Sequence, residues 1–548
     1  MLKKFFLLVF AIIFFKSCSQ KEARNIEQSP KLVVGIVVDQ MRYDYLTRYY
    51  NRYGDGGFKR LLNEGFSLEN GHFNYIPTVT AAGHASVYTG TTPSNHGIIS
   101  NHWYDKFLKK NIYCVTDSTY SSIGTSSERG QRSPYRLMST TITDQLHLAQ
   151  NNKGKTIGIA LKDRSSILPA GHTANAAYWY DGGRNGFFIS SSFYMDELPE
   201  WVKNFNSKKL PENYLSKTWN TLYNIETYTN SFKDNNIYEG VFKGKQTPTF
   251  PYNLNELKSE NGNLGLINTT PFGNSLTLDF AKEAIINEKL GKSEHIDFLA
   301  LSFSSTDYIG HKFGPQSVEI EDTYLRLDKN LEDLFLFLDE KIGKNKYTVF
   351  LTADHGAVHV PAYLQSLKIP AHYLNQQELK NYIIEITKKY FKSDELVENI
   401  SNNQIFLNQE KIEALGFIKQ EVAEKIVEEV TKFDGIYKAI TANKLQTSSF
   451  NSGVWYLLQN GYNQKFSGDV ILIEYPASLS KERTGTSHGS GYHYDTHIPI
   501  IFYGNGIKKG ASKKRYEVTD IAPTIANLLR IEAPNASTGI IIDEVFKD

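Results

Sequence analysis

The segment LVVGIVVD at residues 32–39 is a continuous apolar run that ends in a carboxylate. An uninterrupted run of this length is typical of a strand that is buried on both faces of a sheet. Four similar runs, separated by stretches long enough for helices, lie at residues 156–161, 296–303, 347–352 and 498–503. We therefore predict an α/β fold in which helices cover both faces of a central, mostly parallel sheet. A further helix is expected at 518–529, where Asp520 and Pro523 suit a first turn.

Two stretches rich in Asn, Lys, Tyr and Ser interrupt this pattern, at about 181–274 and 371–464. Both are too long for ordinary connections between neighbouring elements. We expect one catalytic domain at 31–548, with these stretches as inserted cap segments over the active site. Helical patterns at 376–391 and 418–433 predict a small α+β subdomain within the second insertion.

Charged residues nearly balance, with 60 Lys and Arg against 59 Asp and Glu. Such a balance creates no overall field that would attract nucleic acid or an anionic membrane, so neither is expected as a partner. Any selectivity for anions must come from a local site. Cys114 is expected to be a buried apolar residue and not a nucleophile.

The first 20 residues have the pattern of a secretory signal peptide, with Lys3 and Lys4 followed by an apolar run and small residues. The run from Phe5 to Phe15 is shorter than the roughly 20 residues that span a membrane. We therefore predict an exported protein of the bacterial periplasm without a transmembrane span. Cys18 leaves a second interpretation open, in which it carries the lipid anchor of a lipoprotein.

Side chains that commonly bind metals follow several of the predicted strands. Asp39 ends the first run, Asp307 follows the third, and Asp354 and His355 follow the fourth. Ligands of open α/β sheets bind outside the carboxyl ends of the strands, so these side chains can meet in one crevice. His311 lies four residues after Asp307, a spacing that a helical turn places on one face. Each aspartate could instead be a helix N-cap, which sequence alone leaves open.

A histidine-rich segment at 487–497, SHGSGYHYDTH, offers a further metal ligand. His488 lies beside glycines that allow the backbone to approach a metal closely, whereas His493 and His497 form a pair at helical spacing. Spacing alone does not choose between them. Other histidines are interpreted as hydrogen-bonded structural residues, among them His72, His84, His96 and His102.

The segment PTVTAAGHAS at residues 77–86 contains a candidate nucleophile, Thr80. Proline followed by small residues is typical of a loop that turns into a helix, whose free N–H groups suit a phosphate dianion. The alternative is that Thr80 only caps this helix. Lys162 and Arg164 follow the run at 156–161 and could balance a phosphate, or form a solvated surface pair with Asp163.

Together these residues resemble the alkaline phosphatase superfamily and imply its three-layer α/β sandwich. The positions that carry the resemblance are Asp39, Pro77 to Thr80, Gly97 to Asn101, Asp307 with His311, Asp354 with His355, and His488. The threonine and the pair of Lys162 and Arg164 resemble specifically the PafA-type, phosphate-irrepressible bacterial alkaline phosphatases. The resemblance runs from about Lys31 to the C-terminus.

The resemblance implies two zinc ions per chain. It assigns one to Asp307, His311 and His488, and the other to Asp39, Thr80, Asp354 and His355, which chooses His488 over the other two histidines. Asn101, Lys162 and Arg164 would contact the nonbridging phosphoryl oxygens. One zinc would lower the pKa of the Thr80 hydroxyl, and the other would stabilise the departing oxygen and later activate water. The implied enzyme has broad specificity for small phosphate monoesters. It hydrolyses them through a phosphothreonine intermediate and releases inorganic phosphate.

Departures from other members of the superfamily narrow this expectation. No ligand set for a third metal is identified, so magnesium is not predicted. No Cys/Ser-x-Pro-x-Arg motif aligns with Thr80, which argues against sulfate esters. The main alternative is a nucleotide pyrophosphatase/phosphodiesterase, but Lys162 and Arg164 favour monoesters because a diester carries one charge less. A remote alternative is a noncatalytic phosphate-binding surface lipoprotein. We favour a monomer.

Overall fold

The computed structural model describes residues 29–183, 185–480 and 483–547. The predicted signal peptide and Cys18 lie outside these described residues. Within them, no helix combines the length and the apolar character that crossing a membrane requires. Cys114 is buried, as its apolar interpretation predicts.

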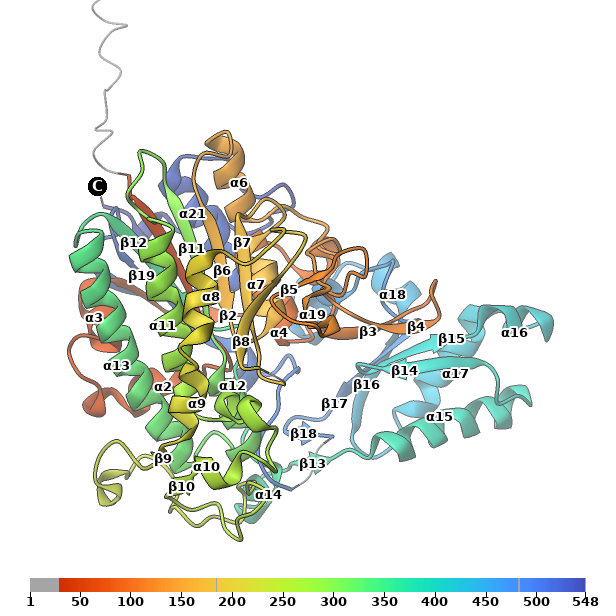
Figure 1. Cartoon of the computed structure of the whole chain (residues 1–548). Helices are drawn as coiled ribbons and strands as arrows, with labels where there is room; N and C mark the ends of the chain where they lie inside the picture. The colour runs from red at the N-terminus through yellow and green to blue at the C-terminus, as the bar shows by residue number, and fades with distance from the viewer. Residues whose placement is uncertain (1–28, 184, 481–482, 548) are drawn as a thin grey trace, which may run out of the picture.

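A ten-stranded sheet forms the centre of the molecule, in the order β20-β2-β19-β12-β1-β11-β6-β7-β8-β5 (Figure 1). Its five middle strands are mutually parallel: β12 (Tyr347–Thr352), β1 (Leu32–Val38), β11 (Asp297–Phe303), β6 (Thr156–Ala160) and β7 (Ala176–Asp181). Every residue of β1, β11 and β12 is buried. The predicted α/β core with a largely parallel centre is confirmed.

The outer strands make the sheet mixed. On one side β19 (His497–Gly504) is antiparallel to both β12 and β2 (Phe66–His72), and β20 (Gly510–Glu517) is parallel to β2. On the other side β8 (Phe187–Ser191) is antiparallel to β7 and to β5 (Ser122–Ile123). The apolar run at 498–503 is therefore a strand of opposite direction. An apolar run indicates that a strand is buried on both faces, and such burial is the same whether the strand is parallel or antiparallel to its neighbours.

Helices cover both faces of the sheet and complete three layers (Figure 1). One layer contains α3 (Phe58–Glu64), α8 (Glu200–Ser207), α11 (Phe272–Asn287) and α13 (Val318–Lys341). The other contains α4 (Thr80–Thr89), α6 (Ile142–Ala149), α7 (Asp163–Ala170) and α21 (Ile521–Leu529). A 3₁₀ turn at Val518–Asp520 leads into α21, so a helical segment lies where the sequence predicted one.

Residues 371–480 come after β12 and before β19 in the chain, and we call them the inserted lobe. The lobe lies beside the core (Figure 1). The lobe has its own sheet, formed by β14 (Val397–Ser401), β15 (Gln404–Leu407), β17 (Val470–Glu474) and β16 (Ile436–Thr441). Its longer helices are α15 (Gln376–Phe391) and α17 (Lys419–Val430), at the positions predicted for helices. They enclose an apolar cluster of the lobe's own, which includes Ile383, Ile426 and Leu472.

Shorter elements complete the fold. Those of the lobe are β13 (His372–Tyr373), α16 (Gln409–Ala414), α18 (Ala442–Thr447), α19 (Gly453–Gly461) and β18 (Ser478–Leu479). Those of the core region are α2 (Asp44–Arg48), α5 (Pro93–His96), β3 (His102–Asp105), β4 (Lys110–Tyr113), α9 (Leu210–Leu215), β9 (Thr218–Trp219), β10 (Tyr252–Asn253), α10 (Leu254–Leu257), α12 (Ser305–Phe313), α14 (Pro361–Ser366) and α20 (His493–Thr496).

A buried acidic pair lies where the stretch around β9 and β10 packs against α12 and α13. Glu239 is 3% exposed and Glu319 is fully buried. Neither carboxylate oxygen of Glu239 has a hydrogen-bond partner within the described residues. Burial, and then the negative charge of Glu319, raise the pKa of Glu239 to about 11. Glu239 is therefore protonated in the folded protein at neutral pH.

We expect Glu239→Gln to stabilise the protein at pH 9 and to change its stability little at pH 5. Glu239 binds a proton more tightly when folded than when unfolded, so its contribution to stability is present below the unfolded pKa and is lost as the pH rises toward the folded one. Glutamine does not ionise, so the variant avoids this loss of folding free energy, which we place at about 2 kcal/mol or more at pH 9. Thermal melts at both pH values measure it, with the exposed Glu256→Gln as control. Equal shifts at the two pH values would contradict the assignment.

Candidate active site

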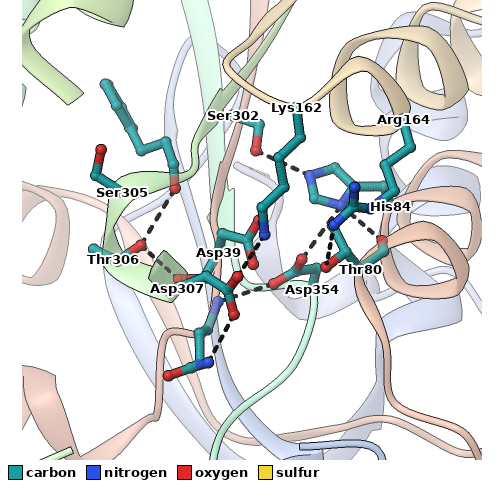
Figure 2. A network of polar contacts seen from close by, with 12 residues as sticks. Asp39, Thr80, His84, Lys162, Arg164, Ser302, Ser305, Thr306, Asp307 and Asp354 are labelled. Carbon is teal, nitrogen blue, oxygen red and sulfur yellow. Dashed lines mark hydrogen bonds and ion pairs between the residues drawn. The ribbon is translucent and has the colours of Figure 1, made fainter. Parts of the chain in front are cut away.

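Three buried aspartates meet at the carboxyl edge of the parallel strands (Figure 2). Asp39 directly follows β1, Asp354 follows β12, and Asp307 lies in the first turn of α12, which begins after β11. β1 is the neighbour of both β11 and β12, so the three strand ends lie side by side. The crevice predicted from the strand ends therefore exists.

Two groups of side chains place their ligand atoms within 4.8 Å of one another: Asp307, His311 and His488, and Asp39, Asp307 and His355. His311 Nε2 lies 3.1 Å, and His488 Nε2 3.7 Å, from Asp307 Oδ1. His355 Nε2 lies 3.6 Å from Asp39 Oδ1 and 3.5 Å from Asp354 Oδ2. The rings of His355 and His488 stack with their centroids 3.4 Å apart. These are two adjacent candidate metal sites, and Asp307 belongs to both.

Main-chain carbonyl groups fix which nitrogen each histidine turns toward the centre. In each of the three histidines, Nδ1 lies within hydrogen-bond distance of a main-chain carbonyl oxygen. The distances are 2.8 Å from His311 to Thr486, 2.8 Å from His488 to Thr78, and 3.0 Å from His355 to Gly356. A carbonyl oxygen only accepts, so Nδ1 carries the proton and Nε2 keeps its lone pair. A hydrogen bond of this kind is the usual support of a metal-binding histidine.

The donor atoms fit divalent cations. Asp39 Oδ1, Asp354 Oδ2 and His355 Nε2 are buried and have no hydrogen-bond partner within the described residues. A buried polar atom without a partner costs about 1–3 kcal/mol, so several at one point indicate a site built for a ligand. Carboxylate oxygens together with neutral imidazole nitrogens are a donor set that zinc accepts.

Lys162 places a positive charge among these carboxylates. Its Nζ lies 2.6 Å from Asp39 Oδ2 and 2.6 Å from Asp307 Oδ2 (Figure 2). The side chain is buried, so the alternative of a solvated surface pair with Asp163 is wrong. Asp163 is instead paired with Arg132. The Lys162 ammonium group lies where it can reach an anion bound between the two candidate metal sites.

Burial and mutual charge shift the pKa of the site residues. Burial raises the pKa of Asp39, and burial together with the charge of Asp39 raises that of Asp354 well above its usual range. Burial acts in the same direction at Asp307, but neighbouring positive charge outweighs it and holds the pKa well below its usual range. Burial also lowers the pKa of His488 to about 3 and that of His355 well below its usual value. Both rings are therefore neutral, as metal binding requires.

Thr80 is the first residue of α4 and is 1% exposed. Val79 holds the N-cap position and its own side chain makes no capping hydrogen bond, so the alternative that Thr80 is the N-cap is wrong. Gly83 lets α4 pack against Asp354, because a Cβ there would lie 2.2 Å from the Asp354 carbonyl oxygen. The Thr80 hydroxyl therefore lies beside Asp354, next to the candidate metal site that contains Asp39 (Figure 2). The N-terminus of α4 favours negative charge at this place.

The remaining predicted substrate contacts surround Thr80. Arg164 Nη2 lies 3.5 Å from Thr80 Oγ1, and Figure 2 shows the guanidinium pointing toward it. Arg164 Nη1 donates to Tyr113 Oη at 3.2 Å. Asn101 Oδ1 accepts a hydrogen bond from the Ala81 N–H at 2.8 Å, which ties this amide to the first turn of α4. Every predicted site residue therefore lies in or beside the crevice.

The competing histidine pair lies elsewhere. His493 and His497 form a ring cluster with His72, with centroids 4.6 to 4.9 Å apart. His497 Nε2 bonds to the Glu69 carbonyl oxygen, so this nitrogen is occupied. The structure brings His488 next to Asp307, and not His493 or His497.

Two residues that the sequence did not single out for the site contact it directly. The Gln40 N–H donates to Asp354 Oδ1 at 3.0 Å, and its Nε2 donates to Asp307 Oδ1 at 2.7 Å. His84 bonds to the Thr80 carbonyl oxygen and to Ser302 Oγ, which matches its structural interpretation, and its Nδ1 also lies 3.5 Å from Asp354 Oδ2. The spacing of four residues between Thr80 and His84 was a signal for this contact.

Comparisons with known proteins agree with this geometry. The family model described as Type I phosphodiesterase / nucleotide pyrophosphatase matches residues 33–495. Alkaline phosphatase PafA of Elizabethkingia meningoseptica is 46% identical over 95% of each chain. The chain belongs to this family, in its PafA-type alkaline phosphatase branch. The solved structure of wild-type PafA aligns with a TM-score of 0.92 at 45% identity, over 95% of this chain and 100% of that one.

Another relative of this alkaline phosphatase, a protein of Myroides odoratus named calcium-transporting ATPase, is 49% identical over 95% of each chain. The superfamily resemblance and the fold class predicted from the motifs are confirmed by the matches.

Proposed function

We propose that this alkaline phosphatase hydrolyses phosphate monoesters through attack of Thr80 Oγ1 on phosphorus, with a phosphothreonine intermediate that water cleaves to inorganic phosphate. The observation that carries the proposal is the position of Thr80. Its buried hydroxyl lies at a helix N-terminus, 3.5 Å from a guanidinium nitrogen of Arg164 and beside Asp354 (Figure 2). Those surroundings stabilise the negative charge that a nucleophilic hydroxyl must develop.

The cationic and amide side chains have a separate role. Phosphoryl transfer spreads negative charge over the peripheral oxygens of the transferred group. We propose that Arg164, Lys162 and the amide of Asn101 bind these oxygens, together with N–H groups of α4. Asp39, Asp307, His311, Asp354, His355 and His488 would hold two metal ions, which we propose to be zinc. When bound, such ions activate the nucleophile and stabilise the departing oxygen.

Phosphodiesterases belong to the same family, so the preference for monoesters needs its own support. Two cations, Lys162 and Arg164, converge on the site, and two phosphate charges match them better than the single charge of a diester. ATP ends in a phosphoryl group with the same charge, so the ATPase named among the relatives fits this proposal as well.

Replacing Lys162 and Arg164 together by Ala is expected to lower kcat/KM for p-nitrophenyl phosphate by about 100-fold or more, and for bis(p-nitrophenyl) phosphate by less than about tenfold. Steady-state kinetics on the metal-loaded enzyme measure both values. Arg129→Ala, at an exposed arginine outside the site, is the control and should change neither rate. Equal losses on the two substrates would contradict the assignment of the two cations to a monoester dianion.

We also propose that the protein is an exported, monomeric periplasmic enzyme with its catalytic domain at 31–548 and insertions at about 181–274 and 371–464. The basic, apolar and small-residue pattern of residues 1–20 supports export. The mass of the mature N-terminus distinguishes cleavage of a signal peptide from a lipid anchor at Cys18.

A further inference from the structure

A groove of 490 Å³ lies between the candidate active site and the inserted lobe. His488, a residue of the candidate metal sites, and Val79, which precedes Thr80, line it on the core side. The end of β17, the following Tyr475, and the turn of Asn402 and Asn403 line it on the lobe side. The groove therefore adjoins the place where the phosphoryl group would bind. In Figure 1, β17 and β18 lie on the side of the lobe sheet that faces the core.

Hydrogen bonds fix the lobe against the core beside this groove. Tyr492 Oη donates to the Glu474 carbonyl oxygen at 2.8 Å. Asn402 Nδ2 donates to the His102 carbonyl oxygen at 2.6 Å. His102 is the residue that follows Asn101, a predicted substrate contact. Asn402 and Asn403 both have positive φ, 52° and 56°, a conformation that asparagine tolerates better than most residues. The two walls are thus joined, and the groove does not need a ligand to form.

Aromatic, aliphatic and uncharged polar side chains make up most of the lining. Tyr475, Tyr492 and Tyr494 contribute aromatic rings, and the two asparagines contribute amide groups. Tyr475 is 39% exposed and lies in the groove lining, where its ring is supported by the rings of His372 and Tyr437 at centroid distances of 5.5 and 5.3 Å. Aromatic faces of this kind stack on flat rings.

No Lys or Arg occurs among the described residues that line the groove. Its acidic residues, Glu474 and Asp495, are engaged within the protein. Glu474 accepts from Asn403 Nδ2, and Asp495 Oδ2 accepts from Ser490 Oγ. Among the described residues of this lining, a leaving group with further negative charges finds no cation to pair with. An uncharged ring does not need such a cation.

We propose that the groove binds the leaving group of the substrate and selects phosphomonoesters of uncharged, planar ring systems, such as nucleosides, over compact or polyanionic leaving groups. The inference rests on the proposed monoesterase function and names its substrate class. Tyr475 is a specificity-determining residue in this proposal, because its ring is the exposed aromatic surface of the lobe wall.

AMP and ribose 5-phosphate test the proposal, since both release a primary alcohol at the same ribose carbon and differ in the adenine ring. We expect kcat/KM for AMP to exceed that for ribose 5-phosphate by at least about fivefold. Tyr475→Ala should lower the AMP value toward that of ribose 5-phosphate and leave ribose 5-phosphate within about twofold. Tyr475→Phe should keep the preference. Tyr390→Ala, at a tyrosine of α15 outside the groove lining, should keep it too.

Three outcomes would overturn the proposal: equal kcat/KM for AMP and ribose 5-phosphate in the wild type, an equal loss on both in Tyr475→Ala, or a higher kcat/KM for ATP than for AMP. A loss in Tyr475→Ala confined to a nucleoside phosphodiester would show that the groove binds the second ester group instead. Failure of the proposed function is distinguishable, because the wild type would then leave ribose 5-phosphate intact as well.

Discussion

Thr80→Ala is expected to lower kcat/KM for a phosphate monoester by at least about 1,000-fold while the protein stays folded. Alanine removes the oxygen that forms the bond to phosphorus. The Asn101 amide and the Arg164 guanidinium remain in place, so substrate binding should suffer less than turnover. The helix should also persist, because Thr80 is not the cap of α4 and alanine is a strong helix former.

Two matched variants separate the loss of a nucleophile from a disturbance of the loop. Thr80→Ser restores a hydroxyl at the same place and should recover at least about 100-fold over Thr80→Ala. Thr78→Ala removes a buried hydroxyl two residues away, which donates to the Ser490 carbonyl oxygen, and should cost less than about tenfold. An active Thr80→Ala enzyme, or Thr78→Ala as inactive as Thr80→Ala, would refute the assignment.

The intermediate itself is a second readout of Thr80. Acid quenching of the wild-type enzyme during turnover should leave phosphate bound to the peptide that contains Thr80, since a phosphothreonine ester survives acid. The Thr80→Ala enzyme should show none. Phosphate on a different residue of the wild type would show that the nucleophile has been misidentified.

The sequence predicted those parts of the site that follow from strand ends. Asp39, Asp307 and Asp354 could be placed together because buried apolar runs precede each of them and parallel strands end at one edge. The i, i+4 pair of Asp307 and His311 depended only on a helical turn, and α12 supplies it. These inferences use local periodicity and one rule of sheet topology, so they did not require long-range contacts.

What the sequence could not supply depends on contacts between distant segments. Lys162 pairs with Asp39 and Asp307, which are 123 and 145 residues away in the chain. Gln40 bridges two of the aspartates through its main chain and its amide, and no pattern in the sequence marks it. The direction of β19 was also undetermined, because burial on both faces looks the same for either direction.

Metal removal should abolish activity and should destabilise the enzyme more at pH 9 than at pH 6. We expect two metal equivalents per chain by elemental analysis, loss of both under a strong chelator, and recovery when zinc is returned. Without metal, burial raises the pKa of Asp39 and of Asp354 in the folded state, so each binds a proton more tightly when folded than when unfolded. Their contribution to stability is therefore present at low pH and is lost as the pH rises above the unfolded value of about 3.9. Bound metal replaces those protons and removes this dependence.

The difference in melting temperature between the metal-loaded and chelated enzyme should therefore widen with pH. A variant with both Asp39 and Asp354 changed to Asn tests the cause, because its chelated form should lose most of the pH dependence that the wild-type chelated form shows. Lys162 Nζ lies 2.6 Å from Asp39 Oδ2, and its positive charge limits the effect at that residue, so Asp354 should account for the larger share. A chelator effect of the same size at both pH values would mean that these two carboxylates do not bind the metal.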